Sequence, residues 1–172
     1  ATLPIGTLSI IIENNIIKFN RYGIALQSAN TTAIIRGNII DSNNIQGDPN
    51  LGGSGINFNG NSTLTALVSK NIIRGNLWGI TIQNAAKPML GNLSISDTNY
   101  NGLNQIYWNH NTGVFYDLYN NTPDSIKAEN NYWGTTIIDT AEAHIFHKPD
   151  NAALGFVDYL PIWTLSGLQQ TG

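Results

Sequence analysis

The sequence contains no cysteine, few charged residues and no long hydrophobic run. Charged residues make up 11% of the chain, compared with roughly 25% in an ordinary globular domain. The absence of cysteine excludes a disulfide framework but leaves the cellular compartment open. The longest apolar run, around Ile10 to Ile12, is far shorter than the ~20 residues of a membrane-spanning helix. We therefore expect no membrane insertion.

The charge that is present is weakly acidic. The formal net charge is -3 and the pI is about 5.4, so the surface has no basic field that would attract phosphate groups. We therefore expect no nucleic-acid partner, and anionic membranes and acidic polysaccharides are disfavoured for the same reason. At 172 residues the chain is long enough for one domain with a sizeable core.

Asparagine is abundant instead. It supplies 25 of the 172 residues, although it is a poor strand former. It recurs in the pattern Asn-x-Ile-x-x-Asn, and successive copies begin 23, 33 and 33 residues apart. The four copies are Asn15/Ile17/Asn20, Asn38/Ile40/Asn43, Asn71/Ile73/Asn76 and Asn104/Ile106/Asn109. A fixed internal repeat of this length is typical of stacked, repetitive folds.

Short stretches with strand periodicity flank each copy. Pairs of small apolar residues precede the first asparagine, as Ile10 and Ile12, Ala33 and Ile35, and Ala66 and Val68. A glycine and an alternating run follow, as Gly23-Ile24-Ala25-Leu26, Gly55-Ile56-Asn57-Phe58, Gly79-Ile80-Thr81-Ile82 and Gly113-Val114-Phe115-Tyr116. Alternation with period two predicts strands. Each unit therefore contains three short strands separated by bends.

This pattern predicts an all-β fold, a parallel β-helix (solenoid) of about five three-sided coils. Neighbouring coils lie about 4.8 Å apart, so equivalent asparagines stack at the bends, where they tolerate a left-handed backbone and can bond to one another. We expect this structural ladder to contain Asn15, Asn20, Asn38, Asn43, Asn71, Asn76, Asn104 and Asn109. Trp133 occupies the same slot as Ile17, Ile40 and Ile73, which predicts a core position.

The predicted domain organisation is residues 1–136 as coils and residues 137–172 as a capping segment and tail. Asp139 and Glu142 form a possible capping box, ahead of a short helix that carries Ala141, Ile145 and Phe146. Two stretches rich in turn formers, residues 45–55 and 96–104, are expected to protrude. At the N-terminal end the strand pattern begins without a cap, so we expect either further N-terminal coils or another chain to stack on that face.

The repeat units resemble those of right-handed parallel β-helices in the pectin-lyase-like superfamily. The segment Asn131-Tyr132-Trp133-Gly134 with Asp139-Thr140, Leu154-Gly155, Val157-Asp158-Tyr159 and Pro161 is similar to a C-terminal block of secreted bacterial β-helix proteins. This resemblance implies a right-handed coil and an extracellular or cell-surface location. It does not imply one activity, because that superfamily includes pectate lyases, polygalacturonases, phage tailspikes and adhesins.

Enzymes on such a scaffold need clustered carboxylates, either as an acid/base pair or as a calcium site beside a basic residue. The repeat places Lys18, Asp41, Arg74 and Tyr107 in one row, which indicates compensating surface charges more than a catalytic groove. Asp117 falls in a row with Gln27, Asn59 and Gln83, without an acidic neighbour. We predict no catalytic residues.

His144 and His147, with Glu142 and Asp139 nearby, are candidate ligands for a zinc ion. A closed zinc site needs four protein ligands and a catalytic one usually three, and the sequence offers no third convincing ligand. We expect these polar residues to satisfy backbone groups at a helix end. No metal and no cofactor are predicted.

Aromatic residues near the bends are the stronger functional candidates. Tyr22, Trp78, Tyr107 and Trp108 could stack on sugar rings while Asn and Gln side chains donate hydrogen bonds, or could pack against a protruding loop. We therefore expect a non-catalytic, extracellular structural or adhesive module, with a polysaccharide or cell-surface glycan as partner. The alternative is a polysaccharide lyase or glycoside hydrolase. Ice binding would require flat threonine rows, which the sequence lacks.

Overall fold

The computed structural model describes residues 6–165, 169 and 170, and its main strands form three parallel sheets. Sheet A contains β1 (Leu8–Glu13), β4 (Thr31–Arg36), β7 (Leu64–Ser69) and β10 (Lys87–Met89). Sheet B contains β2 (Ile16–Lys18), β5 (Ile39–Asp41), β8 (Ile72–Arg74) and β11 (Gln105–Tyr107). Sheet C contains β3 (Ile24–Leu26), β6 (Ser54–Gly60), β9 (Trp78–Asn84), β14 (Leu118–Asn121) and β16 (Ile145–Phe146).

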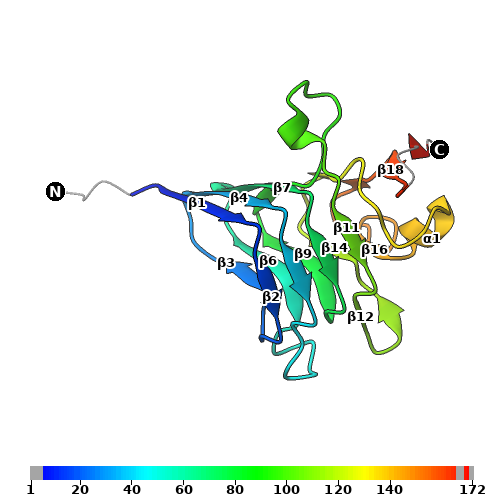
Figure 1. Cartoon of the computed structure of the whole chain (residues 1–172), viewed down its shortest axis with the longest axis horizontal. Coiled ribbons are helices and arrows are strands. Elements are labelled where there is room, and N and C mark those ends of the chain that lie inside the picture. The colour runs from blue at the N-terminus through cyan, green and yellow to red at the C-terminus, as the bar shows by residue number, and fades with distance from the viewer. Residues whose placement is uncertain (1–5, 166–168, 171–172) are drawn as a thin grey trace.

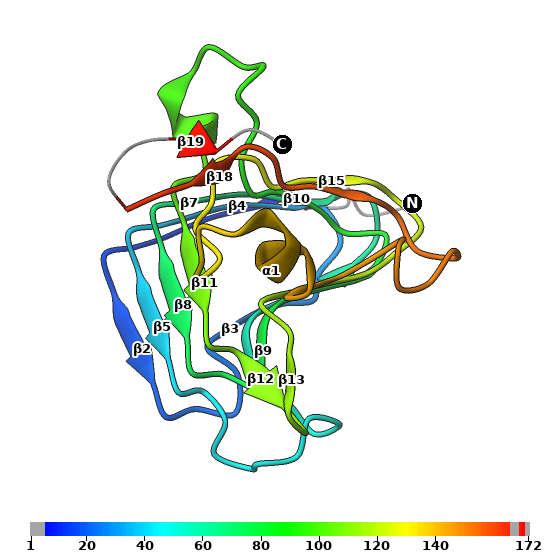
Figure 2. The same cartoon turned by 90° about the vertical axis from the view of Figure 1, so that its right-hand side faces the viewer.

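The chain visits the three sheets in turn and so forms a coil (Figure 1). Seen from the C-terminal end, it runs counterclockwise while it advances toward the viewer, which makes the coil right-handed (Figure 2). The prediction of an all-β, parallel β-helix is confirmed. Residues 44–53 and 92–101 leave the coil as protruding loops, as the turn-forming residues there predicted.

The remaining elements lie in loops or near the C-terminal end. The loop between β10 and β11 contains the 3-10 turn η1 (Thr98–Tyr100). The other elements are the antiparallel pair β12 (His110–Asn111) and β13 (Val114–Phe115), the parallel pair β15 (Ile126–Lys127) and β17 (Val157–Asp158), the antiparallel pair β18 (Ile162–Trp163) and β19 (Gln169–Gln170), and α1 (Ile138–Glu142). No helix in residues 6–165 has the length and apolar character needed to span a bilayer.

The interior is filled by aliphatic residues that repeat in register. Ile17, Ile40, Ile73 and Ile106 stand opposite one another in successive coils. Trp133 continues this column, since Tyr132 pairs with Gln105, and it is fully buried as predicted. Burial of such side chains stabilises the fold by roughly 1.5–3 kcal/mol each, so stacking one more coil adds a full layer of core.

Two columns of asparagines run along the bends and confirm the predicted ladder. In the first, the backbone N–H and the Nδ2 of Asn38 both donate to Oδ1 of Asn71, at 3.0 and 2.9 Å. The Nδ2 group of Asn38 also donates to the carbonyls of Ile12 in the preceding coil and Arg36 in its own coil. The first column is Asn15, Asn38, Asn71, Asn104 and Asn131, and the second is Asn20, Asn43, Asn76 and Asn109.

These bonds explain why so many asparagines occur in a β-rich chain. Asn38, Asn43, Asn71, Asn76, Asn104 and Asn109 are nearly or completely buried. A buried amide destabilises the fold unless its donors and acceptor are paired, and the next coil supplies those partners. Residues just before the first column adopt the left-handed backbone at Asn14, Gly37, Lys70, Leu103 and Asn130, which turns the chain sharply between sheets A and B.

The run Gly113-Val114-Phe115-Tyr116 contains a short strand, but the prediction that it continues the strands after Gly23, Gly55 and Gly79 is wrong. Val114 and Phe115 form a short exposed hairpin with His110 and Asn111, and Leu118 is the residue that pairs with Ile80 of β9. The position equivalent to Gln27, Asn59 and Gln83 is therefore Asn121 and not Asp117. Asp117 lies instead at the end of the second asparagine column, where its Oδ1 accepts from Nδ2 of Asn109 at 2.8 Å.

The predicted capping box is also wrong. The N-cap residue of α1 is Ile137, which makes no side-chain capping bond, and Asp139 lies within the first turn. The helix ends at Glu142, and Ile145 and Phe146 belong to β16, which pairs with β14. The apolar residues that looked like a helix face thus complete the edge of sheet C.

The ladder generates a test of stability. Asn71→Ala leaves the buried N–H and Nδ2 of Asn38 without their acceptor and removes the donor to Ile35, so we expect the free energy of unfolding to fall by about 3 kcal/mol or more. Asn15→Ala is the matched control, because Asn15 is exposed and its backbone N–H still reaches Asn38. The control should lose less than about 1 kcal/mol. Equal losses in urea denaturation would contradict the importance of the buried rungs.

Candidate functional site

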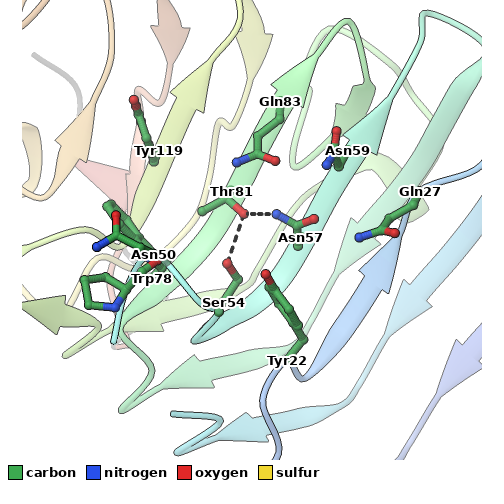
Figure 3. A pocket seen from close by; sticks show the side chains of 12 residues that line it. Tyr22, Gln27, Asn50, Ser54, Asn57, Asn59, Trp78, Thr81, Gln83 and Tyr119 are labelled. Atoms are coloured by element: carbon green, nitrogen blue, oxygen red, sulfur yellow. Dashed lines mark hydrogen bonds between the residues drawn. The ribbon is translucent and has the colours of Figure 1, made fainter. Parts of the chain in front are cut away.

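The outer face of sheet C carries a cleft with an unusually uniform chemistry (Figure 3). Its volume is about 140 Å³, smaller than the roughly 300–1,000 Å³ of pockets that enclose a small molecule. Its lining residues are aromatic, amide or hydroxyl side chains together with a proline and a glycine. They are Tyr22, Gln27, Pro49, Asn50, Gly52, Ser54, Asn57, Asn59, Trp78, Thr81, Gln83 and Tyr119. The cleft therefore suits contact along one side of a chain-like ligand.

The strand register places the polar residues of the floor in rows. Asn57 of β6 lies opposite Thr81 of β9, and Asn59 lies opposite Gln83. Thr81 Oγ1 accepts a hydrogen bond from Nδ2 of Asn57 at 2.6 Å and lies 3.1 Å from the hydroxyl of Ser54. These three side chains are buried at the floor of the cleft and hold one another in place.

Aromatic rings form one wall. Trp78 stacks on Tyr119, with ring centroids 5.5 Å apart and an interplanar angle of 24°, and contacts Tyr116 at 4.6 Å. The indole N–H of Trp78 donates to the carbonyl of Pro49 at 3.2 Å, which holds the loop of residues 44–53 beside the cleft. Burial and the neighbouring Tyr116 raise the pKa of Tyr119, so its hydroxyl stays protonated and can both donate and accept.

The cleft also offers unused hydrogen-bonding groups. The side-chain amides of Gln27 and Gln83 have no hydrogen-bond partner within the described residues. The lining contains no acidic and no basic side chain. The site can thus exchange hydrogen bonds with hydroxyl groups and stack on a flat apolar face, but it has no group for acid/base chemistry.

The structure separates the four aromatic residues predicted to contact glycans. Tyr22 and Trp78 line the cleft on sheet C. Tyr107 and Trp108 lie at the end of β11 in sheet B, edge to face at 5.2 Å, and Trp108 is 64% exposed. Pro49, Asn50, Gly52 and Ser54 come from the stretch 45–55 that was expected only to protrude, and Tyr119 was not singled out at all. Tyr119 was missed because the shifted strand hid its place opposite Thr81.

The outer face of sheet B bears the predicted row of alternating charges. Asp41 binds Lys18 at 3.0 Å and Arg74 at 3.2 Å, and Arg74 continues to the hydroxyl of Tyr107 at 3.1 Å. Burial alone would raise the pKa of Asp41, but hydrogen bonds from the two cations and from Ser42 outweigh it, so the pKa is lowered. The carboxylate is therefore neutralised by its neighbours, as the compensating-charge interpretation predicts.

A second hollow crosses the outer face of sheet A. It has a volume of about 370 Å³ and is mostly apolar, with Ile34, Leu67 and Met89 on successive strands and Tyr100 of η1 at one side. The hydroxyls of Thr32 and Thr65 meet at 3.3 Å in this hollow. It lacks the amide side chains that distinguish the cleft on sheet C.

Two carboxylates do converge near the C-terminal end, which the repeat pattern did not indicate. Lys127 Nζ lies 2.8 Å from Oε1 of Glu129 and 2.6 Å from Oδ2 of Asp158. Hydrogen bonds from Asp158 and Glu129 raise the pKa of Lys127 to about 12, which is opposite to the shift required of a basic catalyst. The other oxygen of Glu129 accepts from the backbone N–H of Leu93 at 2.7 Å. This cluster is a structural ion-pair network.

The two histidines that were candidate metal ligands, His144 and His147, are held in separate pairs. His144 Nδ1 lies 2.9 Å from Oδ2 of Asp117, and its ring stacks on Phe115. His147 Nδ1 accepts the backbone N–H of Val157, so its Nε2 carries the hydrogen donated to Glu142 at 2.9 Å. Within the described residues no group of three or more His, Asp and Glu side chains is arranged to hold a metal ion.

Comparison of the chain with protein-family models, with curated proteins and with solved structures gave no significant match.

The buried pair of Asp117 and His144 yields a prediction about pH. Burial, opposed by hydrogen bonds from His144 and Asn109, raises the pKa of Asp117 above its ordinary value of 3.8. The stability contributed by such a group is fully present below the ordinary pKa and is lost as the pH rises through the raised one. Asp117→Asn removes this dependence but keeps an oxygen for Asn109 and an N–H for His144.

We therefore expect the stability of Asp117→Asn relative to the parent chain to increase as the pH rises above the ordinary aspartate pKa of 3.8. Urea denaturation at several pH values measures this difference. His147→Gln serves as a control, because it removes a buried imidazole outside the Asp117 pair. A parent chain that gains stability relative to Asp117→Asn as the pH rises would contradict the assignment.

Proposed function

We propose that this protein is a non-catalytic β-helical module, extracellular or on a cell surface, that contacts a neutral glycan through the cleft on sheet C. The single observation that carries the proposal is the lining of that cleft, which combines three aromatic rings and five side-chain amides with no charged group. The extracellular location and membership of the pectin-lyase-like superfamily belong to the same proposal. They rest on the resemblance of the repeat and of the C-terminal segment.

The chemistry of the cleft matches that of a neutral sugar. One face of a pyranose ring is apolar and stacks well on Tyr or Trp, while its rim of hydroxyl groups needs donors and acceptors. Tyr22 and Trp78 supply aromatic surfaces, and the amides of Gln27 and Gln83 are available for the hydroxyls. Because the floor groups are already hydrogen-bonded to one another, the site is preorganised and little ordering is needed on binding.

A lyase or hydrolase of the same superfamily is the alternative, but the geometry favours it less. Glycosidases need two carboxylates on either side of the scissile bond, and the cleft contains none. The carboxylates that do converge, Glu129 and Asp158, are both bound to Lys127. An assay for reducing ends or unsaturated products on neutral and acidic polysaccharides should therefore show no cleavage, and reproducible release would contradict the non-catalytic assignment.

Binding should depend on the cleft and not on exposed aromatic surface in general. Tyr22→Ala and Gln83→Ala should each weaken binding of neutral oligosaccharides about tenfold or more, which corresponds to about 1.4 kcal/mol. Trp108→Ala is the matched control, because Trp108 is a more exposed aromatic on a different sheet. It should leave affinity unchanged.

A glycan array with neutral and acidic members, followed by isothermal titration, measures these effects. Thermal unfolding of each variant confirms that the fold is retained. A parent chain that binds only acidic glycans, or binding lost in Trp108→Ala but kept in Tyr22→Ala, would overturn the proposal.

A further inference from the structure

The two asparagine columns have a direction. In every internal rung, Oδ1 accepts the backbone N–H and the Nδ2 of the asparagine one coil earlier. Each internal Nδ2 also donates to a carbonyl of the earlier coil, as Asn43 does to Ile17 at 3.0 Å. Within each column, Oδ1 therefore accepts only from the earlier coil, and the Oδ1 of the later coil receives the backbone N–H and the Nδ2. The two ends of the columns differ chemically.

The N-terminal end of both columns is open within the described residues. Asn15 and Asn20 donate to the next coil, but no described group donates to their Oδ1 atoms, and both side chains are exposed. The strands β1, β2 and β3 are the outermost strands of their sheets at this end. Ile12 and Ile17 are only partly buried, whereas Ile35 and Ile40 opposite them in the next coil are completely buried.

The C-terminal end of the columns is closed. Asp117 ends the second column with a carboxylate that has no donor of its own and is paired with His144. The amide hydrogens of Asn131 in the first column are used on carbonyls of its own and the preceding coil, at Ala128 and Leu90. α1 lies across the interior at this end (Figure 2), and its Ala141 is buried in the core.

This asymmetry excludes a second copy of the chain as the partner for the open end. The N-terminal end of a second copy would place acceptors against acceptors. Its C-terminal end is covered by α1, β16 and β17, and Asp117 and the side-chain amide of Asn131 are already engaged there, so it offers no uncapped coil. The Oδ1 atoms of Asn15 and Asn20 can accept from backbone N–H groups and side-chain amides at two bends five residues apart. The C-terminal side of an uncapped β-helical coil provides such donors.

The charges at the open edge specify that coil further. Glu13 pairs with Arg36 at 2.6 Å, and Lys18 pairs with Asp41 at 3.0 Å, so each row begins at the open edge with a charge that its neighbour in the next coil neutralises. A coil on the other side of β1 and β2 would extend this pairing with a basic residue beside Glu13 and an acidic residue beside Lys18. Residues 36–43, Arg-Gly-Asn-Ile-Ile-Asp-Ser-Asn, have this pattern and are the complement of residues 13–20.

We propose that the N-terminal face, formed by β1, β2 and β3, docks an uncapped coil of a partner parallel β-helix that carries asparagine at both bends, a basic residue two positions before the first asparagine and an acidic residue three positions after it. The docked coil donates to Oδ1 of Asn15 and Asn20 and pairs its strands with the open edges. This interaction is independent of the cleft on sheet C.

The test supplies such a coil from the chain itself. Residues 31–63 are repeated directly ahead of Leu8, so that Leu8 follows Thr63 as Leu64 does in the parent, and Leu8 and Leu64 both stand opposite Thr31. In β1 the amides of Leu8 and Asn14 point to the next coil, so alternation places those of Ser9, Ile11 and Glu13 on the open side. Their hydrogen exchange, followed by NMR, reports directly on docking.

We expect exchange at Ser9, Ile11 and Glu13 to slow by on the order of tenfold or more in the extended chain, with a higher melting temperature. The matched control carries Arg36→Glu and Asp41→Lys in the added copy only, which places like charges beside Glu13 and Lys18. It should show weaker protection. An added coil that stays unfolded, equal protection in both chains, or protection in the parent that rises with its own concentration would each overturn the proposal.

Discussion

The hydrogen bonds between asparagines of neighbouring coils are the constraint on which the structure depends. Three sheets of short strands, some only three residues long, leave the register of each coil weakly defined by backbone pairing alone. Each buried asparagine accepts two hydrogen bonds from the earlier coil and donates to the asparagine of the next coil. These bonds fix the register at two bends per coil. A coil shifted by one residue would leave a buried amide unpaired and would turn its apolar residues outward.

The same constraint explains the composition of the surface. Because the asparagines satisfy the bends internally, the outer faces are free to vary from one sheet to the next. Sheet B carries a neutralised row of charges around Asp41, sheet A an apolar hollow around Leu67, and sheet C a cleft of amides and aromatic rings. Because residues of successive coils lie in register, Ser54, Asn57 and Thr81 at the floor of the cleft on sheet C hold one another in place.

Much of the fold could be predicted from the sequence, because the Asn-x-Ile-x-x-Asn repeat reports directly on the physical interaction. The eight ladder residues, the core position of Trp133 and the row of Lys18, Asp41 and Arg74 all follow from counting along that repeat. The third strand of the fourth repeat unit was predicted wrongly, because Gly113 begins an alternating run like the one after Gly79. The actual register is set by Asp117, whose Oδ1 accepts hydrogen bonds from Asn109. The predicted and the observed registers differ in the residue that accepts from Asn109, the last asparagine of the second column. Counting from a glycine does not identify that residue.

Only part of the cleft on sheet C could be predicted from the sequence, because the register of the strand after Asp117 was predicted wrongly. Tyr22 and Trp78 could be singled out as aromatic residues at bends, but Tyr119 belongs beside them only once Leu118 is placed opposite Ile80. Tyr107 and Trp108 come before the second asparagine of their copy, Asn109, and so stay beside sheet B, whereas Tyr22 and Trp78 come two residues after the second asparagine of theirs. A repeat predicts which residues stack along the axis. Which residues outside the repeat pattern come together depends on the lengths of the loops, and these differ from coil to coil.

The exchange rates of the side-chain amide hydrogens, measured by NMR, test the ladder most directly. The account predicts slow exchange for the Nδ2 hydrogens of Asn38, Asn43, Asn71 and Asn76, which are buried and bonded to the next coil, and fast exchange for the side-chain amides of Gln27 and Gln83. Uniformly fast exchange of all these amides in a folded chain would contradict it.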